Sequence, residues 1–313
     1  MKSIEIMKTG AYLPKTKVTS EEIEKKLKLE KGYIYKRTGI QTRYYAEENI
    51  NEIAKKAVEN LIRKIEDDEK EKIINDIGLI IVATTSPKNM MPGIANEIQK
   101  QLKIEKCISL DILAGCSGYI NALDIAQMYL ATGKVKKALV IGVDKLSSYT
   151  DKEDIGTSII LSDGAGAILL SETEENKKYV SNIQAEIDEN QILTCNVDEK
   201  INMKGKEIYK YAVTNTIENI NGILKKSEEK LENIKYIIPH QSNTKIMKSI
   251  NTRLKLEKEK MYINIEYTGN TFCASIPIAI NEMIEKNLLH NKDKVILLGY
   301  GGGLNTGSIL MEI

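Results

Sequence analysis

The strongest constraint on the fold is a set of short aliphatic runs, because continuous Val, Ile and Leu residues are typical of strands covered on both faces. Helical stretches separate these runs, and this alternation predicts an α/β fold with parallel strand pairing. The predicted strands are residues 77–86, 107–112, 137–144, 164–172, 234–240, 261–267, 294–301 and 307–313. The predicted helices include residues 51–65, 93–103, 244–255 and 276–287.

The order of these elements repeats along the chain. In each half, a strand and a helix precede a second strand, which ends near Cys116 in the first half and near Asn270 in the second. A buried helix, a third strand and a final strand follow. This repetition predicts two duplicated α/β halves, residues 1–175 and 176–313, that share one core. The polar segment 172–206 is the expected join.

Composition narrows the class of protein. The chain has 313 residues, a hydrophobic content of 42% and a formal net charge of +1, which predict a soluble globular protein with no nucleic-acid partner. Four widely spaced cysteines and two histidines favour neither a metal site nor a disulfide framework, and they suit a reducing cytoplasm. We find no signal-peptide pattern and no apolar run of about 18 residues, so we expect no membrane segment.

Cys116 stands in the stretch DILAGCSGY, between a predicted strand and an apolar helix. A cysteine in the first turn of a helix lies at the positive end of the helix dipole, which favours the thiolate. Gly115 and Gly118 allow a close approach by backbone or substrate. Free cysteine is also a common core residue. The stretch by itself therefore leaves both a nucleophile and a packing role open.

His240 ends a predicted strand, and the carboxyl ends of strands are where ligands gather in α/β sheets. The alternative is a hydrogen-bonded histidine in a loop. His290 lies between a predicted helix and a strand and is expected to be a solvated turn residue. His240 is therefore the one strong acid–base or oxyanion candidate.

Two further segments carry weaker signals. Asn270, in TGNTFCASIP, occupies the position in its half that Cys116 occupies in the first, although a Gly-Asn pair is more often a turn. Cys273, in the same apolar stretch, is expected to pack. The loop 299–308, GYGGGLNTGS, can present backbone N–H groups to an anion but lacks the known phosphate-loop spacings. It favours an oxyanion or ligand-backing loop, with a plain strand turn as the alternative.

Taken together, these segments resemble the 3-oxoacyl-acyl-carrier-protein synthase III family of the thiolase superfamily, which initiates type II fatty-acid synthesis. The resemblance covers essentially the whole chain, through TGAYLP, YIYKRTGIQTR, DILAGCSGY, SDGAGAILL, NMKGKEIYKYAV, PHQSN, GNTFCASIP and GYGGGLNTGS. The order Cys-His-Asn is that of synthase III, whereas elongating condensing enzymes use Cys-His-His and thiolases use a second catalytic cysteine. The resemblance implies a thiolase-like fold, with the duplicated α/β halves in a five-layered αβαβα sandwich.

The resemblance also implies a mechanism. Cys116 would attack the acyl thioester and carry the acyl group. His240, donating from Nε2, and Asn270 would bind the thioester carbonyl of malonyl-acyl-carrier protein and stabilise the enolate left by decarboxylation. The backbone N–H groups of Cys116 and Gly302 would form the oxyanion hole. The chemistry needs no metal and no bound redox cofactor, since the coenzyme A thioester is a substrate.

Binding residues follow from the same resemblance. Tyr33 and Arg37 match positions that hold the adenine end of coenzyme A. Met91 matches a position at which the partner subunit of a homodimer lines the acyl pocket. The basic surface expected to receive the acidic carrier protein consists of Lys210, Lys245 and Arg253.

Two departures from the family leave the starter open. Ile155 stands where an arginine is frequent, and residues 304–306 replace the usual Phe-Thr-Trp. The chain is expected to use acetyl-CoA, or to be a specialised paralogue with a longer, branched or carrier-bound starter. A same-fold acyltransferase of secondary metabolism and a non-catalytic partner subunit are further alternatives. The presence of both Cys116 and Asn270 favours condensation over these two.

Overall fold

The computed structural model describes residues 2–196 and 199–313 and contains two large sheets. The first sheet has the strand order β1-β7-β6-β4-β5, formed by β1 (Ser3–Tyr12), β4 (Ile77–Ala83), β5 (Ile108–Ile112), β6 (Lys137–Lys145) and β7 (Asp163–Thr173). The second has the order β11-β12-β13-β8, formed by β8 (Tyr179–Ala185), β11 (Tyr236–Pro239), β12 (Lys294–Gly301) and β13 (Asn305–Glu312). Two small ribbons pair β2 (Thr16–Thr19) with β3 (Thr42–Tyr45) and β9 (Leu193–Thr194) with β10 (Asn202–Met203).

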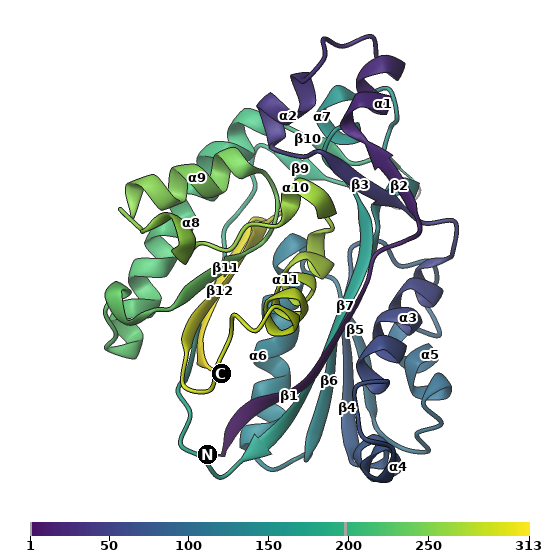
Figure 1. The fold of residues 1–313 in the computed structure, drawn as a ribbon, viewed down its shortest axis with the longest axis vertical. Coiled ribbons are helices and arrows are strands. Elements are labelled where there is room, and N and C mark those ends of the chain that lie inside the picture. Colours follow the sequence, from purple (N-terminus) through teal and green to yellow (C-terminus); the bar gives the residue numbers. More distant parts are fainter. Residues whose placement is uncertain (1, 197–198) are drawn as a thin grey trace.

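Helices cover both sheets and also separate them, which gives five layers (Figure 1). The outer face of the first sheet carries α3 (Ile50–Ile62), α4 (Asp67–Asn75) and α5 (Ile94–Gln101). The outer face of the second carries α8 (Gly205–Ser227) and α9 (Thr244–Arg253). Between the sheets lie α6 (Gly118–Ala131) and α11 (Ser275–Glu285). The predicted αβαβα sandwich is therefore confirmed.

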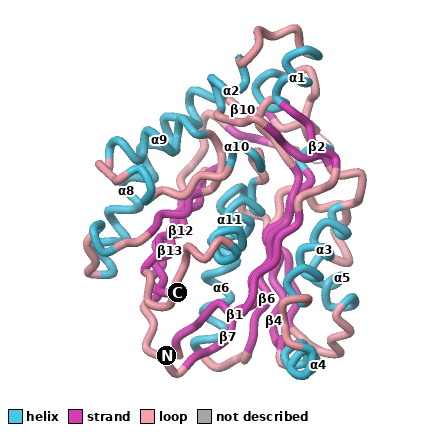
Figure 2. The backbone as a smooth tube through the Cα atoms, viewed as in Figure 1, coloured by secondary structure: helices cyan, strands magenta, loops and turns pink. Residues whose placement is uncertain are grey.

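Shorter elements gather at one end of the sandwich, where Figure 2 shows short helices, loops and the strands β2 and β10. The short helices are α1 (Ser20–Lys26), α2 (Tyr33–Thr38), α7 (Ile155–Ser158) and α10 (Ile265–Thr268). No helix among the described residues is long and apolar enough to cross a membrane.

The central layer is stable because α6 and α11 are apolar on nearly every side. Tyr119 and Leu123 of α6, and Ile276 and Ile280 of α11, are almost fully buried among strands of both sheets. Close packing between β6 and the start of α11 also requires glycine at position 142, since a Cβ there would lie 2.2 Å from the Cys273 carbonyl oxygen. This backbone contact seats the amino-terminal end of α11 against the first sheet.

Most of the predicted elements form, and their pairing is mixed rather than parallel throughout. The pairs β4–β5, β4–β6 and β11–β12 are parallel, whereas β1–β7, β6–β7, β12–β13 and β13–β8 are antiparallel. The sequence analysis missed β1 and the long helix α8. The division into halves 1–175 and 176–313 remains a prediction.

The strand predicted over residues 261–267 is wrong. Met261 makes only an isolated bridge to Ile237, and the chain then turns into α10. The reason is the side chain of Gln241, whose Oε1 accepts hydrogen bonds from the backbone N–H groups of Asn264 (2.9 Å) and Ile265 (3.2 Å). The Gln241 side chain thus binds two backbone N–H groups that would donate to a neighbouring strand if the strand continued.

Candidate active site

Cys116 lies in a 3-10 turn, η1 (Gly115–Ser117), between β5 and α6, and its side chain is buried. Gly115 has a φ of +59°, and a Cβ there would lie 2.5 Å from the carbonyl oxygen of Gly302. A Cβ on Gly301 would lie 2.9 Å from the sulfur of Cys116. Glycine at these two positions therefore lets the glycine-rich loop after β12 pack directly on the thiol.

The thiol of Cys116 is neutral in the free protein. Burial and the charge of Asp144 raise its pKa to about 12. Hydrogen bonds from the backbone N–H groups of Gly302 and Cys116 lower the pKa, but by less. The expectation that the α6 dipole favours a thiolate is wrong, because desolvation is the larger effect. The same two N–H groups are the ones predicted to form the oxyanion hole. Both lower the pKa of the Cys116 thiol, whereas the oxyanion hole itself remains a prediction.

Asp144 is a buried carboxylate near Cys116 that the sequence analysis missed. It accepts hydrogen bonds from Thr85 N (2.7 Å), Ser86 Oγ (2.8 Å) and Cys273 N (2.9 Å). These bonds join the ends of β4 and β6 to the 3-10 turn η5 (Phe272–Ala274), which leads into α11. The one signal in the sequence is an aspartate at the end of the aliphatic run 137–144, which also fits an ordinary strand end.

The ring of His240 is buried directly after β11. Nδ1 lies 2.8 Å from Oγ of Ser275, the first residue of α11. Phe272 and Tyr300 approach the ring edge-on, with centroid distances of 6.3 and 5.4 Å. Burial lowers the pKa of His240 to about 3, so the imidazole is neutral at physiological pH. A neutral imidazole donates one hydrogen bond from one ring nitrogen and accepts one at the other.

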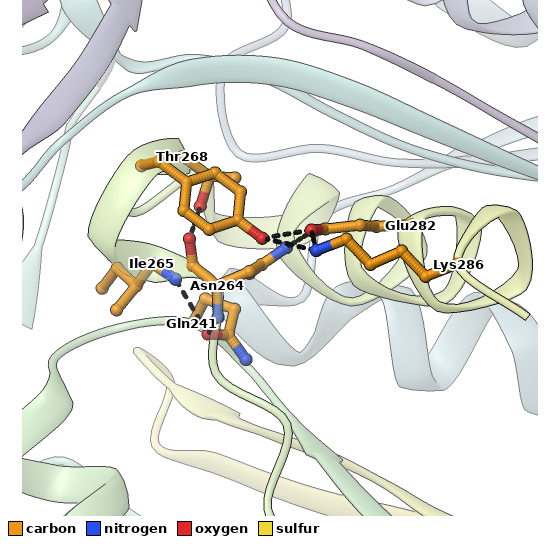
Figure 3. A network of polar contacts seen from close by, with 7 residues as sticks. Gln241, Asn264, Ile265, Thr268, Glu282 and Lys286 are labelled. Atoms are coloured by element: carbon orange, nitrogen blue, oxygen red, sulfur yellow. Dashed lines mark hydrogen bonds and ion pairs between the residues drawn. The ribbon is translucent and has the colours of Figure 1, made fainter. Parts of the chain in front are cut away.

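A polar network ties the segments that lead to His240 and Asn270 to helix α11 (Figure 3). Gln241 holds the backbone of Asn264, whose Nδ2 donates to Glu282 Oε2 at 2.7 Å. Glu282 lies on α11 and also pairs with Lys286. One helix thus anchors the two loops that carry the candidate donors.

Asn270 is oriented by its own loop. Its backbone N–H donates to Ile160 O at 3.0 Å, and its carbonyl accepts from Ser162 N at 2.9 Å. The side-chain Oδ1 accepts from Phe272 N at 3.1 Å. With Oδ1 engaged, the NH2 group is the part of the Asn270 side chain that can donate to a ligand.

Cys116, His240 and Asn270 line one cavity of about 90 Å³. Three segments far apart in the sequence thus bring together a thiol, a neutral imidazole and an amide. Phe272, Tyr300 and Gly301 complete the wall around them. No group of three or more His, Cys, Asp or Glu side chains within residues 2–196 and 199–313 is arranged to hold a metal ion.

A larger groove of about 700 Å³ leads from the surface to this cavity. Groove and cavity share part of their lining, namely Ile160, Met203, Gly205, Asn243 and Ile246. The groove carries Tyr33, Arg37 and Lys245 from the predicted set, and also Lys206, which sequence reasoning missed because lysine is so frequent in this chain. A substrate with an anionic outer end and a narrow inner arm fits this shape.

Tyr33 and Arg37, the residues predicted to hold the adenine end of coenzyme A, contact each other. The Arg37 guanidinium lies over the Tyr33 ring at 5.1 Å, and its Nη1 donates to the Tyr33 hydroxyl at 2.7 Å. Lys210 on α8 and Arg253 at the end of α9 are exposed and lie outside the groove lining. Met91 is 84% exposed and is not among the residues that line the cavity of its own chain.

His290 and Cys273, for which the sequence predicts no catalytic role, lie where that prediction expects them. His290 is exposed in the turn before β12, where its backbone N–H donates to Asp293. Cys273 is buried, and its sulfur donates to Gly115 O at 3.1 Å. Cys273 therefore packs α11 against the turn that carries Cys116.

The comparisons with known proteins agree over the whole chain. A family model described as 3-oxoacyl-[acyl-carrier-protein (ACP)] synthase III matches residues 110–188, and the model of its C-terminal part matches residues 224–313. The chain is 36% identical to beta-ketoacyl-[acyl-carrier-protein] synthase III of Clostridium novyi, an alignment that covers 100% of this chain and 99% of that protein. It is 37% identical to the synthase of the same name from Aquifex aeolicus, with 98% of each chain covered.

Solved structures give the same result. The crystal structure of 3-oxoacyl-[acyl-carrier-protein] synthase III from Aquifex aeolicus VF5 superposes with a TM-score of 0.94 at 36% identity, covering 99% of this chain and 100% of that one. The synthase III from Thermus thermophilus has a TM-score of 0.92 at 29% identity, covering 98% of each chain. On this full-length similarity, the chain belongs to the 3-oxoacyl-acyl-carrier-protein synthase III family.

Proposed function

We propose that this protein condenses an acyl-CoA starter with malonyl-acyl-carrier protein by decarboxylative Claisen condensation and so initiates type II fatty-acid synthesis. The products are 3-oxoacyl-acyl-carrier protein, CO2 and coenzyme A. The observation that carries this proposal is the convergence of Cys116, His240 and Asn270 on one buried cavity at the inner end of a groove.

In the first half-reaction, the sulfur of Cys116 attacks the carbonyl of the acyl-CoA thioester. The bond to the coenzyme A sulfur breaks, and the proton of the cysteine ends on that leaving sulfur. The N–H groups of Gly302 and Cys116 stabilise charge on the cysteine sulfur. We propose that the same two groups hold the oxyanion of the tetrahedral intermediate.

In the second half-reaction, the malonyl thioester carbonyl accepts hydrogen bonds from His240 and Asn270. Loss of CO2 leaves an enolate, whose oxygen these two donors stabilise. The enolate carbon attacks the acyl carbonyl on Cys116, and a carbon–carbon bond forms. The bond from the acyl carbon to sulfur breaks, and the thiolate takes up one proton from solvent. A neutral imidazole suits this step because it donates without attracting the malonyl carboxylate that must depart.

We propose a short starter, acetyl-CoA in the first place. The cavity of about 90 Å³ is small beside the groove of about 700 Å³, which favours a short acyl group. Phe272, the single phenylalanine of the chain, forms part of its wall. The divergent residues 304–306 are not among those that line the cavity; Leu304 is buried, and Thr306 shares a hydrogen bond with the Tyr211 hydroxyl at 2.7 Å.

The proposed reaction assigns no step to a metal or a bound redox cofactor, and coenzyme A enters as a substrate thioester. All four cysteines are unpaired, which suits a reducing compartment. We propose the cytoplasm as the site of action.

Incubation with acyl-CoA thioesters should leave an acyl group on Cys116, measured by mass spectrometry of the peptide. Acetyl-CoA should label at least about tenfold faster than octanoyl-CoA, because a small cavity favours a short acyl chain. Replacing the exposed Cys195 by Ala should leave the label in place, whereas Cys116→Ala should remove it. Absence of a label with every acyl donor would rule out covalent catalysis, and faster labelling by octanoyl-CoA would rule out the short starter.

Asn270→Ala should reduce malonyl decarboxylation by about 100-fold, the usual effect of losing one oxyanion donor. Acyl loading of Cys116 should change by less than about threefold, since that step uses other N–H groups. The two rates are measured separately, as CO2 release and as labelled cysteine. Equal losses in both would show that Asn270 supports the structure of the site rather than the enolate.

We propose that the carrier protein docks on the basic face of α8 and α9, around the mouth of the groove. Lys206 and Lys245 line the groove, and Lys210 and Arg253 are exposed on the same two helices. Lys245→Glu should weaken carrier-protein binding about tenfold at low salt, and about 1 M salt should erase the difference. Lys235→Glu is the matched control, since this exposed lysine stands before the opposite end of β11. Equal binding by both variants would place docking elsewhere.

We propose that the protein is a homodimer joined through β5, the edge strand of the first sheet. Beside this edge, Met90, Met91 and Leu113 are 98%, 84% and 68% exposed. Asp111 of β5 ties the methionine loop to the edge by accepting from Ile94 N at 2.6 Å. An apolar patch beside an unpaired strand is typical of an interface, and it would bring Met91 to the partner's acyl cavity.

Met91→Asp should therefore convert the dimer to a monomer, measured by light scattering. Ile187→Asp is the matched control, because Ile187 is 86% exposed but lies beyond β8, away from the β5 edge. A monomeric parent protein, or a dimer that survives Met91→Asp unchanged, would contradict this interface.

A further inference from the structure

We propose that Glu24 is a positioning residue for the acyl-CoA donor. Its buried carboxylate fixes the first turn of α2, the helix that presents Tyr33 and Arg37 to the groove. The inference rests on the proposed function and adds to it a residue that acts on the donor through these two side chains. It concerns the nucleotide end of the donor and not the acyl group.

Helix α2 begins without a side-chain cap of its own. Its N-cap residue is Gly32, which has a φ of +79° and no side chain that could accept a hydrogen bond. The first N–H groups of any helix lack partners inside the helix, and α2 has only six residues. Acceptors for these N–H groups must therefore come from another part of the chain.

The carboxylate of Glu24, which belongs to helix α1, supplies two of these acceptors. Its Oε2 accepts from the backbone N–H of Gly32 at 2.9 Å, and its Oε1 accepts from that of Ile34 at 2.8 Å. Tyr33 lies between the two, and its own N–H donates to the carbonyl oxygen of Glu30 at 3.1 Å. Three successive N–H groups are thus held, two of them by one side chain, so the position of Glu24 sets the direction of the first turn of α2.

The support beneath α2 is itself packed. Glu24 is only 4% exposed, although it is a charged residue. Ile23, its neighbour on α1, lies in one buried cluster with Ile34 of α2 and with Ile159, which follows α7 and also lines the groove. Figure 1 shows α1, α2 and α7 together at one end of the sandwich. A carboxylate thus holds the start of α2 while apolar packing holds its inner face, which leaves its other face to the groove.

Tyr33 and Arg37 face the groove as one unit. They are four residues apart on α2, and the guanidinium lies over the ring at 5.1 Å. The ring offers an apolar surface for stacking, and the guanidinium offers charged donors to phosphate, a pair that suits a nucleotide. Neither residue lines the inner cavity that contains Cys116. A shift of α2 should therefore weaken binding of the nucleotide end and leave acyl transfer itself intact.

Two acyl donors separate this role from general support of the fold. Acetyl-CoA carries the nucleotide end, whereas S-acetyl-pantetheine has the same thioester arm without it. Glu24→Ala should raise KM for acetyl-CoA about tenfold in loading of Cys116, with kcat and the rate of loading from S-acetyl-pantetheine within about twofold of the parent. Glu24→Gln keeps one acceptor oxygen and should give an intermediate KM. The matched control is Glu21→Gln on the same helix, which removes only an exposed ion pair with Lys25 and should leave all rates unchanged.

Equal losses with both donors would indicate a structural role only and would overturn the proposal, as would an unchanged KM for acetyl-CoA in Glu24→Ala. A Tyr33→Ala/Arg37→Ala protein provides a second check. Adding Glu24→Ala to it should cost less than about a further twofold, because the side chains through which Glu24 acts are already absent. A further tenfold loss in that background would also overturn the proposal.

Calorimetry with adenosine 3′,5′-bisphosphate, a fragment of the nucleotide end of coenzyme A, gives a reading without turnover. The parent should bind it, and Glu24→Ala should bind about tenfold more weakly, while Glu21→Gln binds as the parent does. Equal binding by the parent and Glu24→Ala, or no binding by the parent, would overturn the proposal. This measurement needs no acyl transfer, so its outcome is distinct from a failure of the condensation function, which a missing acyl label on Cys116 would report.

Discussion

Helices α6 and α11 are buried side by side between two sheets, and the position of every catalytic candidate depends on this packing. A 3-10 turn precedes each helix, with Cys116 in one turn and Cys273 in the other. The sulfur of Cys273 donates to Gly115 O, and Asp144 holds the Cys273 N–H, so the two turns are tied to each other and to the first sheet. A core substitution that shifts either helix would therefore displace the nucleophile relative to its donors.

The same packing decides the electrostatics. Both side chains are buried, so the thiol of Cys116 and the imidazole of His240 are neutral before substrate binds. Charge develops only during the reaction, first on sulfur and later on the enolate oxygen. Donors that are already in place act strongly in such a low-dielectric site, because no solvent has to reorganise. A buried cavity with few but fixed hydrogen-bond donors is well suited to decarboxylation.

Sequence reasoning worked best at strand ends. Cys116 and His240 follow runs that were predicted as strands and that form β5 and β11, and the carboxyl edge of such strands is where ligands bind. It failed where side chains override local preference. Residues 261–267 have a strand-like pattern, but Gln241 captures the backbone donors that would have extended the sheet. Helix α8 was missed because its sequence is rich in β-branched residues and Asn, and it owes its stability to packing on the second sheet.

The sequence by itself determined the α/β alternation and the resemblance to the family, and it proposed Cys116, His240 and Asn270 as candidates, because each of these depends on residue type and order along the chain. Only the tertiary structure decided their charge states, since burial between two sheets outweighs the local helix dipole. Only it brought Ser275 to His240 across 35 residues, and only it revealed Asp144 near the thiol. Desolvation and hydrogen-bond geometry arise when distant segments pack together, and no local pattern encodes them.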